Sequence, residues 1–272
     1  MWFDVQVFTT RKRGTRMKHL IIGAGTVGKA TGIWLEAHNQ VVTFTDIDID
    51  VTAKLKEEGH LVTREAITWY DYDMLWVCTH EKDVESVLHD LEGLPHPVII
   101  RSTTSPGSAE KYAVHYNVQN LFHIPEFLKE ATAIHDMFNP DHHIIGATKN
   151  VDPRIQSLVA NIFSGQDAPT MWCSATMSEL VKLIANNWLA TQISFWNEVN
   201  TLCTKMSMNK QAIADAVTKD KRISKYGSIM IGKPFSGMCL PKDLDALISV
   251  FTCNNIEPKL LKVVRDINAN LE

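Results

Sequence analysis

Short apolar runs of strand length alternate with helix-like segments through the first half of the chain. Most runs are rich in Val, Ile, Leu, Phe or Met and end in a polar or glycine-containing turn. The runs lie at residues 19–22, 41–45, 60–63, 74–78, 98–101, 120–124 and 142–146. Helices are expected at residues 26–37, 50–58 and 83–91, after Pro106-Gly107, and in a turn that begins at Pro125. This alternation predicts an α/β domain with a mainly parallel, doubly wound sheet.

The second half changes to helical periodicity. Helices are expected at residues 152–163, 209–218, 240–252 and 258–271, with one short strand at 170–173. Residues 174–206 contain neither Gly nor Pro, and a helix of that length spans about 50 Å at ~1.5 Å per residue. Its apolar residues surround the helix axis almost completely, so the helix is either buried on all sides or shared between subunits. We therefore expect a homodimer.

Three segments follow from these patterns. Residues 1–16 carry Arg11, Lys12, Arg13 and Arg16 with no apolar stretch behind them, and Met17 opens directly into the first strand. We interpret residues 1–16 as an N-terminal tail without the features of a signal peptide. Residues 17–150 form the α/β domain, and residues 151–272 form an all-helical central domain built on the long helix.

Composition and charge narrow the class of protein. The 272 residues are 45% hydrophobic and 21% charged, as in ordinary globular proteins, and the net charge is −4. This charge predicts neither nucleic acid nor an anionic membrane surface as the partner. No apolar run reaches the ~20 residues of a membrane span. The five cysteines are widely spaced and odd in number, which favours a reducing, cytoplasmic location over a disulfide framework or a zinc site.

A glycine-rich motif follows the first expected strand. Residues 23–28 read Gly-Ala-Gly-Thr-Val-Gly, a helix follows, and a second strand ends at Asp46. This order is the fingerprint of a Rossmann dinucleotide-binding unit. The first glycine permits the tight turn, the second lets a pyrophosphate approach, and the third lets helix and strand pack closely. The expected NAD contacts here are Gly23, Gly25, Thr26, Val27, Gly28 and Asp46. The Asp46 carboxylate would repel the 2′-phosphate of NADP, so NAD is expected in preference to NADP.

Polar residues also follow later strands. Thr79 and Thr103 come at strand ends, where open α/β sheets bind ligands, although a plain turn hydroxyl explains each equally well. Glu126 and Glu130 fall four residues apart, on one face of the turn expected after Pro125. A solvated acidic face is the ordinary explanation of such a pair. The adjacent His142 and His143 lack spaced partners, so no metal site is predicted.

A thiol, an ammonium and a carboxylate lie within five residues near the last helices. Cys239 precedes Pro241, which suits the first turn of a helix. The helix N-terminus and Lys242 favour the thiolate, and Asp243 can fold back as a base. The alternative is a buried, inert cysteine beside an ordinary helix start.

The long helix carries a polar stripe on its apolar surface. Glu179, Lys182 and Asn186 recur at spacings of three and four residues. Burying a lysine is unfavourable unless the ammonium is paired or used. A structural ion pair with Glu179 and a functional lysine explain the stripe equally well.

Taken together, these motifs resemble the UDP-glucose/GDP-mannose dehydrogenase family over about residues 17–272. The matching segments, in order, are residues 23–28, 46–48, 102–103, 125–130, 179–186, 197–198 and 239–243. The resemblance implies oxidation of the C6 alcohol of a nucleotide sugar, UDP-glucose above all, to a uronate with two NAD, a step of polysaccharide biosynthesis. It implies that Cys239 forms a thiohemiacetal and then a thioester, and it reverses the ordinary explanations of Cys239, Lys182 and the two glutamates.

The same resemblance implies a role for each site residue. Lys182 and Asn186 would stabilise oxyanions, while Asp243 and Glu126 would handle protons and the hydrolytic water near Thr103. Thr79, Thr103, Glu130 and Lys242 would line the cofactor side.

The chain also departs from the family pattern. The family's third, substrate-gripping domain would begin where the chain stops, at Glu272. Ser236, Ala131 and Asn187 replace the usual glycine, glycine and alanine. A separate chain could supply the missing domain, and two other functions stay open. One is a non-catalytic homologue that binds NAD and dimerises. The other is a two-domain 3-hydroxyacid dehydrogenase, which has no need of Cys239.

Overall fold

The protein is described by a computed structural model that covers residues 16–65, 67–237 and 239–271. The chain divides into two compact units, one ending at Leu180 and one beginning at Val181. The segment expected to be an N-terminal tail lies outside the described residues except for Arg16.

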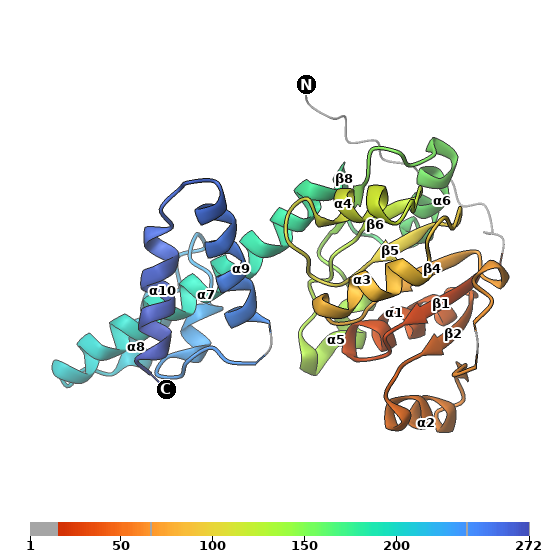
Figure 1. Ribbon diagram of the computed structural model, residues 1–272. Helices are drawn as coiled ribbons and strands as arrows, with labels where there is room; N and C mark the ends of the chain where they lie inside the picture. Colours follow the sequence, from red (N-terminus) through yellow and green to blue (C-terminus); the bar gives the residue numbers. More distant parts are fainter. Residues whose placement is uncertain (1–15, 66, 238, 272) are drawn as a thin grey trace. The chain divides into compact units, whose positions relative to one another are not determined.

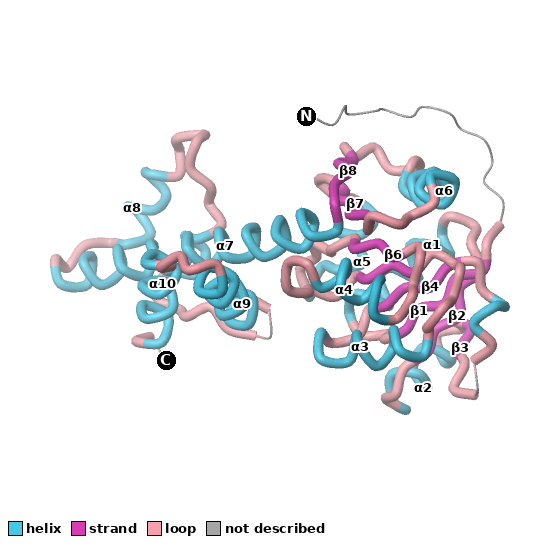
Figure 2. The backbone as a smooth tube through the Cα atoms, turned by 45° about the horizontal axis from the view of Figure 1, so that its top comes forward, coloured by secondary structure: helices cyan, strands magenta, loops and turns pink. Residues whose placement is uncertain are grey.

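The first unit is built on one sheet, with eight strands among the described residues (Figures 1 and 2). Its strand order is β3-β2-β1-β4-β5-β6-β7-β8, in which only β6 and β7 pair antiparallel. The strands are β1 (Lys18–Ile22), β2 (Val41–Thr45), β3 (Leu61–Val62), β4 (Met74–Val77), β5 (Val98–Ile100), β6 (Leu121–His123), β7 (His143–Ala147) and β8 (Thr170–Ser174). The order reverses between β1 and β4, which is the ligand-binding position of doubly wound folds.

Helices link and cover these strands. They are α1 (Thr26–Ala37), α2 (Ile49–Glu57), α3 (Glu81–Asp90), α4 (Ser108–His115), α5 (Ala133–Phe138) and α6 (Pro153–Phe163), with short 3₁₀ turns η1 (Trp69–Asp71) and η2 (Glu130–Thr132). Asp48 and Asp152 cap α2 and α6 by accepting a hydrogen bond from the N–H two residues on. The predicted alternation of strands and helices is confirmed.

Alternate side chains of the central strands form two cores, one on each face of the sheet. Trp34, Phe44 and Trp76 belong to one core, and Leu20 and Leu75 belong to the other. All five are fully buried. Strands that are buried on both faces read as continuous apolar runs, which is why the sequence marks them so clearly.

The second unit is helical in its described residues. It contains most of α7 (Ala175–Lys205), then α8 (Lys210–Val217), the 3₁₀ turn η3 (Gly227–Met230), α9 (Leu240–Cys253) and α10 (Lys259–Ala269) (Figure 1). Its core joins α7, α9 and α10 around Ala190, Phe235, Leu244 and Val264. The predicted single long helix is confirmed as α7, with 31 residues.

Two expectations are corrected. The first unit ends at Leu180 and not at residue 150, because the strand expected at residues 170–173 pairs with β7 in the same sheet and does not belong to the helical unit. The turn after Pro125 is not helical: residues 124–129 have no regular structure, and η2 begins only at Glu130. Glu126 and Glu130 therefore do not share a helix face. The Glu126 carboxylate accepts the N–H of Leu128, two residues on, at 2.6 Å in a non-helical turn.

Candidate functional site

The glycine motif forms the turn between β1 and α1. Gly23 has a φ of 88°, and a Cβ there would lie 2.8 Å from the backbone of Cys78 and Thr79. A Cβ on Gly28 would lie 1.9 Å from the Gly23 carbonyl oxygen. At Gly25, by contrast, no described atom lies within 4 Å of an added Cβ. Gly23 and Gly28 are thus required by close packing, whereas the space next to Gly25 is open.

The open space lies at the start of α1. Gly25 is the N-cap residue of α1 and supplies no capping side chain, and Thr26 and Val27 begin the helix. The N–H groups of a first helical turn bind anions, and here no side chain of the described residues caps them. This arrangement fits the pyrophosphate of a dinucleotide.

Asp46 follows β2 and lies beside the same turn. One carboxylate oxygen accepts the Ala24 N–H at 2.7 Å, and the other accepts the Asp48 N–H at 2.9 Å. The acid therefore orders the glycine loop in addition to any ribose contact.

The ends of β4 and β5 meet through Ser102. Its hydroxyl donates to the Thr79 carbonyl oxygen at 2.6 Å. The Thr79 hydroxyl is buried and has no hydrogen-bond partner among the described residues. Thr103 follows Ser102 and is half-buried. An unpartnered buried hydroxyl beside the glycine turn is suited to a polar ligand group.

Glu179 binds the loop that follows Thr103. Its buried carboxylate accepts the Thr104 hydroxyl at 2.8 Å, the Gly107 N–H at 2.6 Å and the Ala109 N–H at 2.9 Å. Burial raises the pKa of Glu179, opposed by the three donors. Gly107 is the N-cap residue of α4 and has no side chain, so Glu179 supplies the anion that the helix start favours. The sequence pattern did not predict this role.

In the second unit, Asp243 is the centre of a hydrogen-bonded cluster. Its carboxylate accepts the Asn186 amide at 2.6 Å and pairs with the Lys242 ammonium at 2.8 Å. Asn187 donates to the Asp243 backbone carbonyl at 2.9 Å. Lys182 lies one turn before Asn186 on α7 and is buried. The polar stripe of α7 and the start of α9 are thus brought together by Asn186 and Asp243.

Cys239 is the N-cap residue of α9, and its carbonyl oxygen accepts the Asp243 N–H at 2.9 Å. Its side chain is exposed, so the alternative explanation, a buried cysteine beside an ordinary helix start, does not hold. Cys253 is also exposed but ends the same helix. Burial raises the pKa of the Cys78 thiol to about 12 and that of Cys173 to about 11. Cys239 is therefore an accessible thiol at the helix end that favours a thiolate.

The predicted site residues are divided between the two units. The glycine turn, Asp46, Thr79, Thr103, Glu126 and Glu130 belong to the first unit, and Lys182, Asn186, Cys239, Lys242 and Asp243 belong to the second. Three buried asparagines that sequence reasoning did not assign, Asn187, Asn197 and Asn268, hydrogen-bond the segment around Cys239. Asn197 lies in the segment 197–198 that matches the family pattern, whereas no sequence motif surrounds Asn268.

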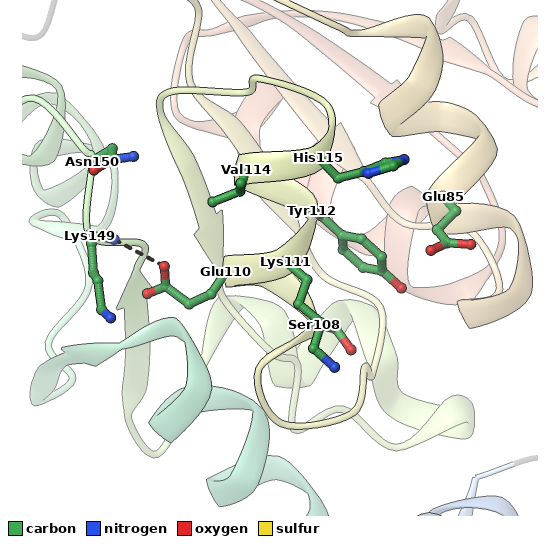
Figure 3. A pocket seen from close by; sticks show the side chains of 9 residues that line it. All are labelled: Glu85, Ser108, Glu110, Lys111, Tyr112, Val114, His115, Lys149 and Asn150. Atoms are coloured by element: carbon green, nitrogen blue, oxygen red, sulfur yellow. Dashed lines mark hydrogen bonds between the residues drawn. The ribbon is translucent and has the colours of Figure 1, made fainter.

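A further hollow of about 810 Å³ lies along the outer side of α4 (Figure 3). Tyr112, Lys111 and Glu110 of α4 line it together with Lys149 and Glu85. None of the predicted site residues lines it.

No cluster of three His, Cys, Asp or Glu side chains suited to a metal occurs among the described residues. Within the same residues, no helix is both long and apolar enough to cross a membrane.

Two family models match the chain. The model of the UDP-glucose/GDP-mannose dehydrogenase family, NAD binding domain, matches residues 66–164, and that of the family's central domain matches residues 176–270. These two segments make up well over half of the chain. The chain belongs to the UDP-glucose/GDP-mannose dehydrogenase family. The expected family, the Rossmann and helical fold, and NAD as cofactor are thereby confirmed.

Individual relatives extend this result. The UDP-glucose 6-dehydrogenase of Campylobacter jejuni is 28% identical over 93% of this chain and 72% of its own length. A UDP-glucose dehydrogenase structure from Pyrobaculum islandicum is 24% identical, with a TM-score of 0.86 over 96% of this chain and 70% of that one. A 3-hydroxyisobutyrate dehydrogenase of Mycobacterium tuberculosis is 16% identical, with a TM-score of 0.76 over 94% of both chains. Across eight of the curated relatives that it matches, the chain spans between 30% and 72% of their length.

Proposed function

We propose that this protein is an NAD-dependent nucleotide-sugar 6-dehydrogenase, with UDP-glucose the first candidate substrate and a uronate the product. The observation that carries the proposal is the combination of an exposed Cys239 at the start of α9 with the Asn186–Asp243–Lys242 cluster in its first turn. A thiol at this position suits covalent chemistry on an aldehyde. Family membership supports the same reaction class.

Residues of the first unit fit the cofactor. The open space at Gly25, the uncapped start of α1 and the Thr79 hydroxyl would hold NAD, with Asp46 toward its ribose. When bound, NAD accepts hydride, and two equivalents are needed for a four-electron oxidation. Thr103, Glu130 and Lys242 are proposed as further residues on the cofactor side.

The chemistry proposed for the second unit begins with Cys239. Its sulfur adds to the carbonyl carbon of the C6 aldehyde, and the carbonyl oxygen becomes the oxyanion of a thiohemiacetal. Lys182 and a second amide N–H of Asn186 stabilise that charge. Loss of a hydride from the thiohemiacetal carbon, which a second NAD would accept, leaves a thioester. Water then replaces the sulfur to release the carboxylate and the thiol. Asp243, assisted by Glu126 and Thr103, takes the proton from that water.

Partners are part of the proposal. The substrate is a nucleotide sugar, and the protein forms a homodimer. The other proposed partner is a separate chain that supplies a substrate-binding domain. Because distant parts of a substrate help drive its reaction, we expect weak affinity for this chain alone and rescue by a chain that supplies a nucleotide-binding domain. Micromolar binding of UDP-glucose without a partner would contradict this expectation. The location we propose is the cytoplasm.

The deciding experiment is a panel of nucleotide sugars in which NADH and acid products are counted. Two NADH and one uronate per sugar are expected. Cys239→Ser should stop the reaction near the aldehyde or leave a slowly hydrolysed ester, since an alkoxide leaves less readily than a thiolate. Cys253→Ser is the matched control, because that thiol is equally exposed but ends the same helix, and turnover should be unchanged.

A two-domain 3-hydroxyacid dehydrogenase is the second candidate. The observation that favours it is the likeness to the M. tuberculosis enzyme over 94% of both chains. That reaction releases one NADH and needs no thiol. One NADH per molecule of a 3-hydroxyacid, with full activity after Cys239→Ser, would favour this candidate. Binding of NAD without turnover of any substrate would favour the non-catalytic homologue.

A further inference from the structure

The segment from Gly232 to Cys239 connects η3 to α9 without regular secondary structure in its described residues. Gly232 and Gly237 both have left-handed backbone conformations, with φ of 81° and 83°. No described atom lies within 4 Å of a Cβ added at Gly237. Three earlier residues of the segment, Gly232, Lys233 and Phe235, hydrogen-bond to buried side chains of the second unit.

Asn197 of α7 binds the first part of this segment. It is almost fully buried, at 1% exposure. Its amide oxygen accepts the Gly232 N–H at 2.6 Å, and its amide nitrogen donates to the Lys233 carbonyl oxygen at 2.8 Å. Both polar atoms of the side chain are thus used on the loop backbone.

Asn268 of α10 binds the next part in the same manner. Its oxygen accepts the Phe235 N–H at 2.8 Å, and its nitrogen donates to the Phe235 carbonyl oxygen at 3.0 Å. The amide therefore takes both backbone groups of one residue, as a neighbouring strand would. The Phe235 ring is buried in the core between α7, α9 and α10.

Only an amide satisfies both asparagine positions. Each site presents one N–H donor and one carbonyl acceptor in a buried setting, and a side-chain amide supplies the complementary acceptor and donor. Aspartate would keep the acceptor but leave a carbonyl facing a carboxylate, and leucine would leave both backbone groups unpaired. The two residues lie on different helices and converge on the stretch that precedes Cys239.

We propose that Asn197 and Asn268 are positioning residues that fix Cys239 at the N-terminus of α9 by clamping Gly232, Lys233 and Phe235. The assignment rests on the proposed function only for its consequence in catalysis. The effect of the clamp on the reactivity of the Cys239 thiol does not depend on whether the protein oxidises a sugar.

The test compares two thiols on one helix. Iodoacetamide labelling of the full chain, followed by mass spectrometry, gives the rate at Cys239 divided by the rate at Cys253, measured from pH 6 to 9. In Asn268→Asp, Asn268→Leu and Asn197→Asp this ratio at neutral pH should fall about two- to fivefold, because a thiol that leaves the helix N-terminus loses its stabilising dipole. The midpoint of the Cys239 pH profile should move up, and that of Cys253 should stay in place.

Two control variants separate positioning from loss of stability. Asn270→Asp changes an exposed asparagine at the end of α10 and should leave the ratio unchanged. Val264→Ala removes buried volume from the core that also holds the Phe235 ring and lowers the melting temperature, but it keeps both asparagine amides and all four of their hydrogen bonds, so the ratio should again be unchanged. An unchanged ratio in the Asn268 and Asn197 variants would overturn the proposal. So would an equal fall in Val264→Ala at a matched melting temperature. If Asn268→Leu fails to fold, the two aspartate variants decide the matter.

A catalytic readout is added if dehydrogenase activity is found. The clamp variants should lower kcat by a larger factor than they raise the KM for NAD, because most residues proposed for NAD, Gly25 and Asp46 among them, are in the other unit. Absence of activity in the parent protein would count against the proposed function alone and leave the labelling result intact.

Discussion

Two buried histidines show how single residues limit the conditions in which the fold is stable. His19 in β1 accepts the Trp76 indole N–H through Nδ1 at 3.0 Å, so its own proton belongs on Nε2, which faces Gln40. Burial lowers the pKa of His19 to about 4, and burial together with Arg101 lowers that of His143 to about 4. Both side chains are therefore neutral in the folded protein at neutral pH.

These pKa values predict loss of stability in mild acid. Each histidine titrates near 6.5 when unfolded and near 4 when folded, so the unfolded state binds more protons between these values. The contribution of the two neutral histidines to the free energy of unfolding is fully present above about pH 6.5. It is lost as the pH drops toward 4, by roughly 3 kcal/mol for each histidine. Urea unfolding at a series of pH values measures the slope.

Substitution tests whether the buried histidines cause this pH dependence of the free energy of unfolding. His143→Gln should flatten the pH dependence by about half, whereas His89→Gln, at a side chain that is 71% exposed, should leave it unchanged. Equal free energies of unfolding at pH 7.5 and pH 5 in the parent protein would contradict the prediction.

At the scale of elements, local patterns predicted most helices and strands because each is marked by its own residues. The apolar runs of β1, β4 and β5 are buried on both faces, and α6 begins at the Asp152-Pro153 pair. The segment after Pro125 was mispredicted because carboxylate spacing cannot decide whether a helix forms. There the Glu126 carboxylate binds the Leu128 N–H in a non-helical turn.

The start of α4 depends on a residue far away in the sequence. Glu179 accepts three hydrogen bonds from Thr104, Gly107 and Ala109, and the loop between β5 and α4 is thereby tied to α7. Spacing along α7 placed Glu179 beside Lys182 but could not reveal a contact some 70 positions away.

Replacement of this carboxylate should be costly. In Glu179→Gln the amide nitrogen must face one of the three donors, so we expect a loss of about 2–3 kcal/mol in the free energy of unfolding. Thr104→Val removes only one of the three bonds and should cost about 1 kcal/mol. Chemical denaturation of both variants, with hydrogen exchange of the Gly107 and Ala109 amides, measures the effect. Full protection of those amides in Glu179→Gln would show that the helix start does not depend on the charge.

At the scale of the whole molecule, the division into units was the least predictable feature. A strand at residues 170–173 was expected, but the pairing of β8 with β7 joins two stretches separated by α6, and local patterns do not report such pairing. The candidate site residues could be named from the sequence, because their motifs occur in the same order as in the family pattern. Their roles stay predictions. Asn197 lies in a segment that matches the family pattern, but its role could not be predicted, and Asn268 could not be named at all, because only the folded chain brings it to Phe235.

The long helix carries an apolar stripe that the second unit leaves uncovered. Its exposed members are spaced by four and seven residues and therefore lie on one face of the helix. They are Ile184, Trp188, Phe195 and Leu202, each at least half exposed. The opposite face, with Leu183, Ile193 and Trp196, is buried. The expectation that this helix is apolar all round is thus refined to one buried face and one exposed face.

A second copy of the chain is the occupant we predict for this stripe. A seven-residue repeat of large apolar side chains along a helix is suited to the same stripe on a partner, and exposed aromatic residues are enriched at interfaces. Phe195→Glu combined with Trp188→Glu should convert a dimer to a monomer in sedimentation or light scattering, because it sets like charges against each other at the contact. Thr204→Glu is the control, since Thr204 is exposed on the opposite side of α7 from Phe195, and the dimer should persist. A parent protein that stays monomeric at high concentration, or a double variant that stays dimeric, would show that the stripe has another purpose.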